Sequence, residues 1–242
     1  MKQFSPKHIT TIMLTLTVIL LFSVQTTINA KEKLKSTDPN HPVRWKKDIQ
    51  RFERQDKQNP KIKNAILFIG GSNFRLWNLK KYFPDLPVIN RGFGGSMISD
   101  ANYYLDRIVF PYQPKTIVLY GGANDMGRGH KTPLQVLKDY EEFVNRVHQK
   151  LPKTNIVYFS LPHFFRSRNN SDEIAKVNRV NELISAVTLK DHRLEYVEIN
   201  KAMADQNGDP RKELFIKDGI HMSPAGYQIW AEKLMPFLKQ IR

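Results

Sequence analysis

Residues 65–72, with the sequence AILFIGGS, form a run of five apolar residues that ends in two glycines and a serine. A short apolar run without polar alternation is typical of a strand that is buried on both faces. Glycines at the end of such a strand suit a sharp turn of the backbone. The segment therefore predicts a buried parallel strand followed by a tight loop that leads to Ser72.

The same pattern recurs along the chain and predicts the fold. Four more runs have the length of strands, at 87–90, 116–120, 156–160 and 194–199. Helical patterns lie near 75–82, 97–107, 133–150, 172–189 and 224–239. Alternating strands and helices predict a three-layer α/β/α sandwich with a five-stranded, mostly parallel, doubly wound sheet.

The last helix has a recognisable start and a predicted inner face. Ser223 is a good N-cap residue, and Pro224 suits the first helical position. We expect the helix to run to about residue 239. The side chains expected to face inward are Ile229, Trp230, Leu234 and Phe237.

The first thirty residues have the features of a secretory signal peptide. Lys2 and Lys7 precede the uncharged, mostly apolar residues 9–24, and the small residue Ala30 suits a cleavage site. A retained N-terminal anchor is the alternative, although residues 9–24 are short of the roughly 20 residues that span a membrane. Both interpretations predict an extracytoplasmic protein, secreted or periplasmic.

The remaining chain is expected to have two parts. Residues 31–64 are predicted to be a charged N-terminal helical extension. Within it, Trp45, Ile49 and Phe52 are spaced as on one face of a helix near 43–57. Residues 65–242 are predicted to form the main domain, which carries the candidate site.

The composition excludes several classes of protein. The chain has 242 residues, 40% of them hydrophobic, and no cysteine. The absence of cysteine excludes a disulfide scaffold, a thiolate zinc site and a Cys nucleophile. The net charge of +15 favours anionic partners such as acidic glycans or phospholipid headgroups. Nucleic acid is not expected as a partner, because the basic residues are scattered and not interleaved with aromatic residues.

Three glycine-rich loops follow the first three predicted strands. They are GGSN at 70–73, RGFGGS at 91–96 and GGAND at 121–125. In an open parallel sheet, ligands bind outside the carboxyl ends of the strands, so these loops are the expected site. Taken alone, Ser72 would most simply cap a helix. Nucleotide binding is not predicted, because no G-x-x-x-x-G-K-[ST] motif occurs and Met97 breaks the G-x-G-x-x-G pattern in the second loop.

A fourth segment, Asp218-Gly219-Ile220-His221, precedes the last predicted helix. An Asp and a His three positions apart can form a carboxylate–imidazole pair that leaves Nε2 free to take a proton from a serine. Taken alone, the pair is also compatible with a structural turn or a metal pair. No other histidine has metal-ligand spacing, so no metal and no cofactor are predicted.

These four segments, in this order, resemble the SGNH (GDSL-type) hydrolase superfamily, which includes lysophospholipase-like esterases. The resemblance covers about 65–238 and implies the flavodoxin-like fold of these hydrolases. It implies that Ser72 is the nucleophile, His221 the base and Asp218 the residue that orients His221. It also implies an oxyanion hole made by the N–H groups of Ser72 and Gly94 and the side-chain amide of Asn124. Gly71 stands where the family commonly has Asp, and Asn73 where it often has an aliphatic residue.

The implied function is a secreted serine esterase that needs no cofactor. Its substrate would be a small-molecule, glycan or lipid ester, of the small-acyl, carbohydrate O-acetyl or lysophospholipid type. The alternatives are an acyltransferase that uses the same acyl-enzyme and a non-catalytic binding domain with this fold. Membrane contact is expected only through an uncleaved N-terminal segment.

Other residues near these loops have expected roles. Asp125 is expected to be structural, because Asp often bonds nearby backbone groups. Phe164 and Phe165 could line an acyl pocket or pack in the core. Tyr120, Arg91 and Arg75 could shape the cleft.

Overall fold

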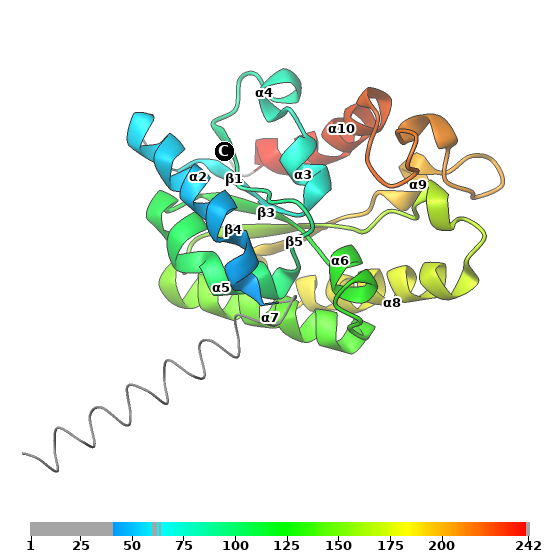
Figure 1. The fold of residues 1–242 in the computed structure, drawn as a ribbon, viewed down its shortest axis with the longest axis horizontal. Helices are drawn as coiled ribbons and strands as arrows, with labels where there is room; N and C mark the ends of the chain where they lie inside the picture. The colour runs from blue at the N-terminus through cyan, green and yellow to red at the C-terminus, as the bar shows by residue number, and fades with distance from the viewer. Residues whose placement is uncertain (1–40, 60–61, 63, 241–242) are drawn as a thin grey trace, which may run out of the picture. The chain divides into compact units, whose positions relative to one another are not determined.

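The computed structural model describes residues 41–59, 62 and 64–240. Residues Trp45–Arg242 form one compact unit, whose ribbon is shown in Figure 1. Its strands are β1 (Ile66–Gly70), β2 (Val88–Asn90), β3 (Thr116–Tyr120), β4 (Asn155–Phe159) and β5 (Leu194–Val197). The α-helices are α2 (Lys46–Gln58), α3 (Ser72–Leu76), α4 (Leu79–Tyr82), α5 (Ile98–Ile108), α6 (Ala123–Gly127), α7 (Pro133–Lys150), α8 (Ser171–Thr188), α9 (Asn200–Met203) and α10 (Pro224–Gln240). Short 3-10 turns are η1 (Pro42–Trp45), η2 (Phe110–Tyr112), η3 (Phe165–Ser167) and η4 (Lys212–Leu214).

The five strands form one sheet in the order β2-β1-β3-β4-β5. All neighbouring strands run parallel, so the predicted mostly parallel sheet is entirely parallel. The chain goes outward from β1 to β2 and then crosses back to β3 on the other side of β1. Because the direction of winding reverses there, the carboxyl ends of β1 and β3 form the switch point where ligands bind in such sheets.

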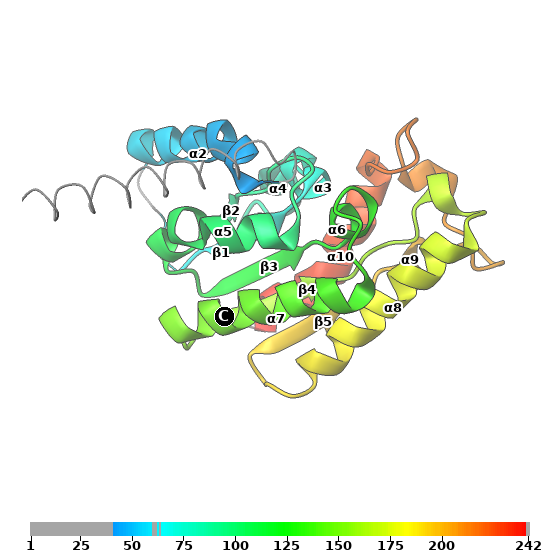
Figure 2. The ribbon, with the colours of Figure 1, turned by 60° about the horizontal axis from the view of Figure 1, so that its bottom comes forward.

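Helices cover both faces of the sheet (Figure 2). Successive side chains of a strand point to opposite faces, and β4 shows this directly. The ring of Tyr158 packs edge-on against Tyr140 of α7, with centroids 5.4 Å apart. The next residue, Phe159, lies 4.9 Å from the ring of Trp230 in α10. One layer therefore contains α5, α7 and α8, with α2 packed on α5, and α10 lies in the other layer.

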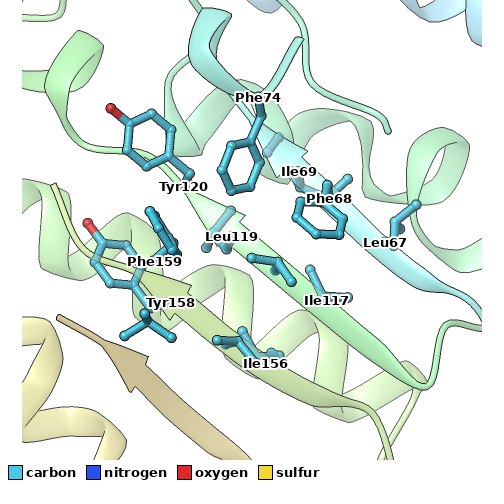
Figure 3. Packing of buried hydrophobic residues seen from close by; sticks show 14 of the residues in the cluster. Leu67, Phe68, Ile69, Phe74, Ile117, Leu119, Tyr120, Ile156, Tyr158 and Phe159 are labelled. Atoms are coloured by element: carbon cyan, nitrogen blue, oxygen red, sulfur yellow. The ribbon is translucent and has the colours of Figure 1, made fainter. Parts of the chain in front are cut away.

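A cluster of aromatic side chains lies between the sheet and α10. Figure 3 shows buried hydrophobic residues of this part of the sheet, among them Phe74, Tyr120 and Phe159. Trp230 has no exposed surface, and its ring lies 5.3 Å from Tyr120 and 6.3 Å from Phe74. Trp230, Leu234 and Leu238 are the fully or almost fully buried residues along this face of α10. Ile229 and Phe237, which were predicted to face inward, are only half-buried against the core.

The helix predicted near 75–82 is instead two short helices, α3 and α4. Trp77 interrupts them with an extended backbone, and its side chain is 2% exposed. The Trp77 ring lies 5.7 Å from Phe68 and 5.5 Å from Phe83. Asn78 then caps α4 by accepting a hydrogen bond from the Lys81 N–H. Burial of Trp77 thus outweighs the local helical pattern.

Helix α2 packs into the core of the compact unit through Ile49 and Phe52, which are 0% and 3% exposed. Asp56 of α2 lies 2.5 Å from Arg91 and accepts a hydrogen bond from Tyr112. Arg91 Nε in turn donates to the Tyr112 hydroxyl at 2.8 Å. This buried network ties α2 to the start of the second glycine-rich loop.

The signal peptide or anchor predicted at 1–30, and the first part of the extension predicted at 31–64, lie outside the described residues. Within the part of the chain that is described, no helix has the length and apolar character needed to cross a membrane.

Replacing Trp230 with Ala should destabilise the fold strongly. The substitution opens a cavity among Phe74, Tyr120 and Phe159, and such changes cost about 3–5 kcal/mol of unfolding free energy. Urea denaturation would measure the loss. Leu189→Ala is the matched control, because Leu189 is 86% exposed and its truncation should change stability by no more than about 0.5 kcal/mol. Equal unfolding free energies for the two variants would contradict the conclusion that the aromatic cluster stabilises the fold.

Candidate active site

The three glycine-rich loops meet at the carboxyl ends of β1, β2 and β3. The Phe93 N–H donates to the Gly70 carbonyl at 2.9 Å. The Ser96 hydroxyl donates to the same carbonyl at 3.1 Å. The Asn124 side chain donates to the Ser96 carbonyl at 3.1 Å. These bonds hold the second loop between the other two, so the candidate residues of all three loops share one site.

Ser72, His221 and Asp218 form a hydrogen-bonded chain. His221 Nε2 lies 2.8 Å from Ser72 Oγ, and His221 Nδ1 lies 2.6 Å from Asp218 Oδ2. A serine hydroxyl beside an imidazole that a carboxylate orients is the arrangement used for nucleophilic catalysis.

The Asp218 carboxylate is held in a tight turn. Its Oδ1 accepts hydrogen bonds from the N–H groups of Ile220 at 2.8 Å and His221 at 2.9 Å. Desolvation raises the pKa of Asp218, but the hydrogen bonds from the His221 side chain and from these two N–H groups outweigh it. They lower the pKa of Asp218 to about 2. The group is therefore ionised at neutral pH and can stabilise an imidazolium at His221.

Ser72 does not cap the helix that follows it. Gly71 is the N-cap residue of α3, and Ser72 is its first helical residue. The Ser72 side chain points to His221 instead. At the other end of the site, Ser223 does take the capping place predicted for it, because its hydroxyl accepts a hydrogen bond from the Gly226 N–H at 3.2 Å.

The proposed oxyanion donors lie around Ser72. Within the described residues, the N–H groups of Ser72 and Gly94 donate to no other protein group. The Asn124 amide uses one hydrogen for Ser96 and retains a second. A Cβ added at Gly71 would lie 2.9 Å from Asn124 Nδ2. Gly71, where the family commonly has Asp, therefore leaves the space that Asn124 occupies.

Asn73 connects the serine to the histidine, a connection that the sequence did not reveal. It is 3% exposed. Its Nδ2 donates to the Ile220 carbonyl at 3.3 Å, and its Oδ1 accepts from the Met222 N–H at 3.1 Å. The side chain of Asn73 thus pairs with the backbone on both sides of His221. The only sequence signal was a polar residue at a position that is often aliphatic.

Two tyrosines complete the surroundings of Asn73. Its Nδ2 also donates to the Tyr120 hydroxyl at 3.4 Å, and the Tyr227 hydroxyl donates to the Asn73 carbonyl at 2.8 Å. Burial raises the pKa of Tyr120, which stays neutral. The place of Asn73 is therefore fixed from the sheet and from α10.

Asp125 has the structural surroundings expected for it. It is fully buried and accepts hydrogen bonds from the N–H groups of Ile98 and Gly122, both at 3.0 Å. Burial raises the pKa of Asp125 to about 6, although Lys131, 3.7 Å away, opposes the shift. Gly122 has φ +123°, a conformation that only glycine adopts readily. Asp125 thus fixes the turn that presents Asn124.

A cavity of about 600 Å³ adjoins the site beside Asn124 and Ile220. Phe164, Val177 and Met126 form an apolar part of its lining. The lining also includes three cations and two acids, which are Arg128, Arg166, Lys176, Asp172 and Glu173. Phe164 therefore lines the cavity, whereas Phe165 lies away from it near Lys212.

Of the three residues expected to shape the cleft, which are Tyr120, Arg91 and Arg75, one lies at the site. Tyr120 is buried beneath Asn73, and Arg91 points to Asp56. Only Arg75 lies against the site, next to Gly94. No group of three His, Asp or Glu side chains able to hold a metal ion occurs in the described part of the chain.

Comparison with known proteins identifies the family of the chain. A sequence model of the GDSL-like Lipase/Acylhydrolase family matches residues 77–229. The chain is 26% identical over 172 residues to a GDSL esterase/lipase of Oryza sativa subsp. japonica. That alignment covers 63% of this chain and 65% of the rice protein, so the chain spans less than two thirds of its relative.

Solved structures show the same fold. A protein from Streptococcus pneumonia, described as a candidate platelet activating factor, is 23% identical with a TM-score of 0.72. The match covers 90% of this chain and 99% of that one. A GDSL-like lipase from Bacteroides thetaiotaomicron is 16% identical with a TM-score of 0.70, over 80% of this chain and 98% of its own. Because the family match covers more than half of the 242 residues, the chain belongs to the GDSL-like lipase/acylhydrolase family, within the SGNH hydrolase superfamily.

Proposed function

We propose that this protein is an extracytoplasmic serine esterase that hydrolyses carboxylic esters through Ser72, His221 and Asp218. The observation that carries the proposal is the continuous chain of hydrogen bonds from Ser72 Oγ through His221 to Asp218, with distances of 2.8 and 2.6 Å. Family membership supports the same reaction class. The proposal that the protein is exported rests on the sequence of residues 1–30, which resembles a signal peptide.

In the first step, Ser72 Oγ attacks the ester carbonyl carbon. His221 Nε2 takes the hydroxyl proton as the new C–O bond forms. Asp218 accepts the hydrogen bond from Nδ1–H, which fixes the tautomer and stabilises the imidazolium. The proton then passes from Nε2 to the leaving alcohol as the ester C–O bond breaks, and an acyl-enzyme remains.

The negative charge on the tetrahedral oxygen needs donors that are already in place. The N–H groups of Ser72 and Gly94 and the amide of Asn124 supply them. Preorganised donors of this kind stabilise the transition state without reorganisation, and the loss of one typically costs about 10²–10³ in turnover.

Water resolves the acyl-enzyme by the reverse sequence. His221 Nε2 takes a proton from the water, whose oxygen attacks the acyl carbon. The proton then returns to Ser72 Oγ as the acyl group leaves as a carboxylic acid. No cofactor takes part in either half of this reaction.

The cavity beside Asn124 suits the acyl group. Phe164, Val177 and Met126 offer an apolar surface in the same cavity as Asn124, a proposed oxyanion donor. Its volume of about 600 Å³ accommodates an acetyl group or a longer chain. We therefore propose a small-acyl, carbohydrate O-acetyl or lysophospholipid-type ester as substrate.

Substitution of Ser72 with Ala should abolish ester hydrolysis and leave the fold intact. Without the nucleophile, kcat for p-nitrophenyl acetate, butyrate and octanoate should fall by about 10³-fold or more. The comparison uses residues 31–242 and circular dichroism to check folding. Ser185→Ala on α8, outside the site, is the control and should keep full activity. A Ser72→Ala variant that hydrolyses these esters at the wild-type rate would overturn the proposal.

Asp218→Asn should lower kcat by about 10²-fold or more, because the imidazolium loses its carboxylate partner. The matched control is Asp205→Asn. Asp205 also accepts backbone N–H bonds in an exposed turn, from Asn207 at 2.8 Å and Asp209 at 3.0 Å, but no histidine contacts it. Equal rates for the two variants would remove Asp218 from the mechanism.

The same variant has a predicted dependence of stability on pH. The pKa of Asp218 falls from its ordinary value of 3.8 to about 2 on folding, so the ionised group stabilises the folded state above pH 3.8. Wild type should therefore be more stable than Asp218→Asn at pH 7, and the difference should shrink as pH falls from about 4 to 2. Urea denaturation at several pH values measures it. If the difference in unfolding free energy stayed constant over this range, folding would not favour the ionised form of Asp218 over the protonated form.

Asn73→Leu should lower kcat by about tenfold or more with a smaller change in KM. The variant leaves the Ile220 carbonyl and the Met222 N–H unpaired, so His221 loses its fixed distance to Ser72. Asn102→Leu is the control, because Asn102 is 2% exposed and donates to the Asp139 carbonyl at 2.9 Å, away from the site. It should lose stability but keep kcat. If Asn73→Leu lost only stability, its role would be purely structural.

A further inference from the structure

A second cavity lies beside the same catalytic loops. It has a volume of about 520 Å³ and is lined mainly by residues of α2, of the whole of β2, and of the α3–α4 segment. Figure 2 shows α2, α3 and α4 close to β2, the edge strand of the sheet. The lining includes Arg75 and Gly92, so the cavity borders the 91–96 loop that carries Gly94. We call it the basic groove.

The charge of the basic groove is strongly positive. Its lining contains four cations and one acid, and the cations are Arg51, Arg75, Lys80 and Arg91. The acid, Asp56, is already bound by Arg91 at 2.5 Å and by the Tyr112 hydroxyl. Arg51 pairs with Asp48 outside the lining, at 3.2 Å.

Two of these cations have no carboxylate partner. Among the described residues, neither Arg75 nor Lys80 forms an ion pair, and both side chains are exposed. Lys80 lies on α4, and Arg75 lies one helical turn after Ser72 on α3. Their positive charge is therefore available to a ligand.

Arg75 joins the basic groove to the catalytic centre. A Cβ added at Gly94 would lie 2.8 Å from Arg75 Nε and 3.2 Å from its Cζ. The guanidinium group thus packs on Gly94, the residue whose N–H is a proposed oxyanion donor. A group bound by Arg75 would lie next to the ester carbonyl.

We propose that the basic groove binds an anionic group, a carboxylate or a phosphate, on the alcohol part of the ester. The inference rests on the proposed esterase function. The cavity beside Asn124, with its apolar surface of Phe164 and Val177, takes the acyl group. The alcohol part of the ester lies on the other side of the carbonyl and is then left for Arg75 and Lys80. Their field also attracts anionic substrates to the site before contact.

The test compares three acetyl esters with the same acyl group, which are 4-acetoxybenzoate, the neutral 4-acetoxybenzamide and 4-acetoxyphenyl phosphate. Each kcat/KM is divided by the rate of that ester with hydroxide, which removes differences in leaving-group reactivity. For wild type at low salt, the benzoate should be preferred to the benzamide by about fivefold, as expected for two exposed ion pairs. The preference should shrink as ionic strength rises.

The double variant Arg75→Gln/Lys80→Gln should lose the preference, whereas Arg75→Lys should retain it. Arg75→Gln can also lower the hydrolysis of every ester by disturbing Gly94. The neutral benzamide measures this general loss, so the ratio of kcat/KM for the benzoate to that for the benzamide still reports the recognition of charge. Lys138→Gln on α7, an exposed cation outside the groove, should keep the wild-type ratio. Equal ratios in wild type and the double variant would overturn the proposal.

The phosphate ester identifies the kind of anion. If the preference over the benzamide is larger for the phosphate than for the benzoate, the alcohol part of the substrate is assigned as phosphorylated. If the two preferences are equal, the groove recognises negative charge in general, which a carboxylated saccharide would also supply.

Failure of the esterase proposal would look different. In that case wild type would hydrolyse none of the three esters. The basic groove is then tested by calorimetric binding of 4-hydroxybenzoate and 4-hydroxybenzamide to the Ser72→Ala variant. Binding of the benzoate alone, lost in the variant that also carries Arg75→Gln/Lys80→Gln, supports the groove, and equal binding of both compounds overturns it.

Discussion

The hydrogen bond of 2.8 Å between Ser72 Oγ and His221 Nε2 joins side chains that are 149 positions apart in the chain. Such a bond weakens steeply when its distance or angle changes, so the backbone on both sides must be held rigidly. On the serine side, β1 is a fully buried strand between β2 and β3. On the histidine side, Asp218 closes a tight turn, and Asn73 pairs directly with the backbone that flanks His221.

The interactions that stabilise the fold also position the site. Trp230 of α10 packs against Tyr120 of β3, and the Tyr120 hydroxyl accepts a hydrogen bond from Asn73. Tyr227, one turn earlier in α10, donates to the Asn73 carbonyl. Packing of the last helix on the sheet therefore acts on the distance between Ser72 and His221. Side chains of α10 that have no contact with the proposed substrate are therefore expected to influence the proposed reaction.

Two cavities with different charge border the candidate active site. The cavity beside Asn124 has a mixed lining, in which three cations are offset by two acids, whereas the lining of the basic groove has four cations and one acid. Helix α2 contributes to the basic groove but lies outside the residues that match the family. This addition is a part of the proposed site that the family's common fold does not supply, and the fold alone does not determine function.

The sequence by itself determined the parallel sheet, its strands and most of its helices. Helix α7 occupies the predicted residues 133–150, because an amphipathic pattern with a Thr132 cap and Pro133 is a local signal. The four segments that contain Ser72, Gly94, Asn124 and Asp218–His221 were also readable, since each is short and contiguous. The tertiary structure alone decided the break at Trp77, the pairing of Asn73 with the His221 turn, and the contact of Arg75 with Gly94. Each of these features depends on contacts between segments that are far apart in the sequence. A local sequence pattern indicates whether a residue is buried or polar, but it does not identify the residue's partner.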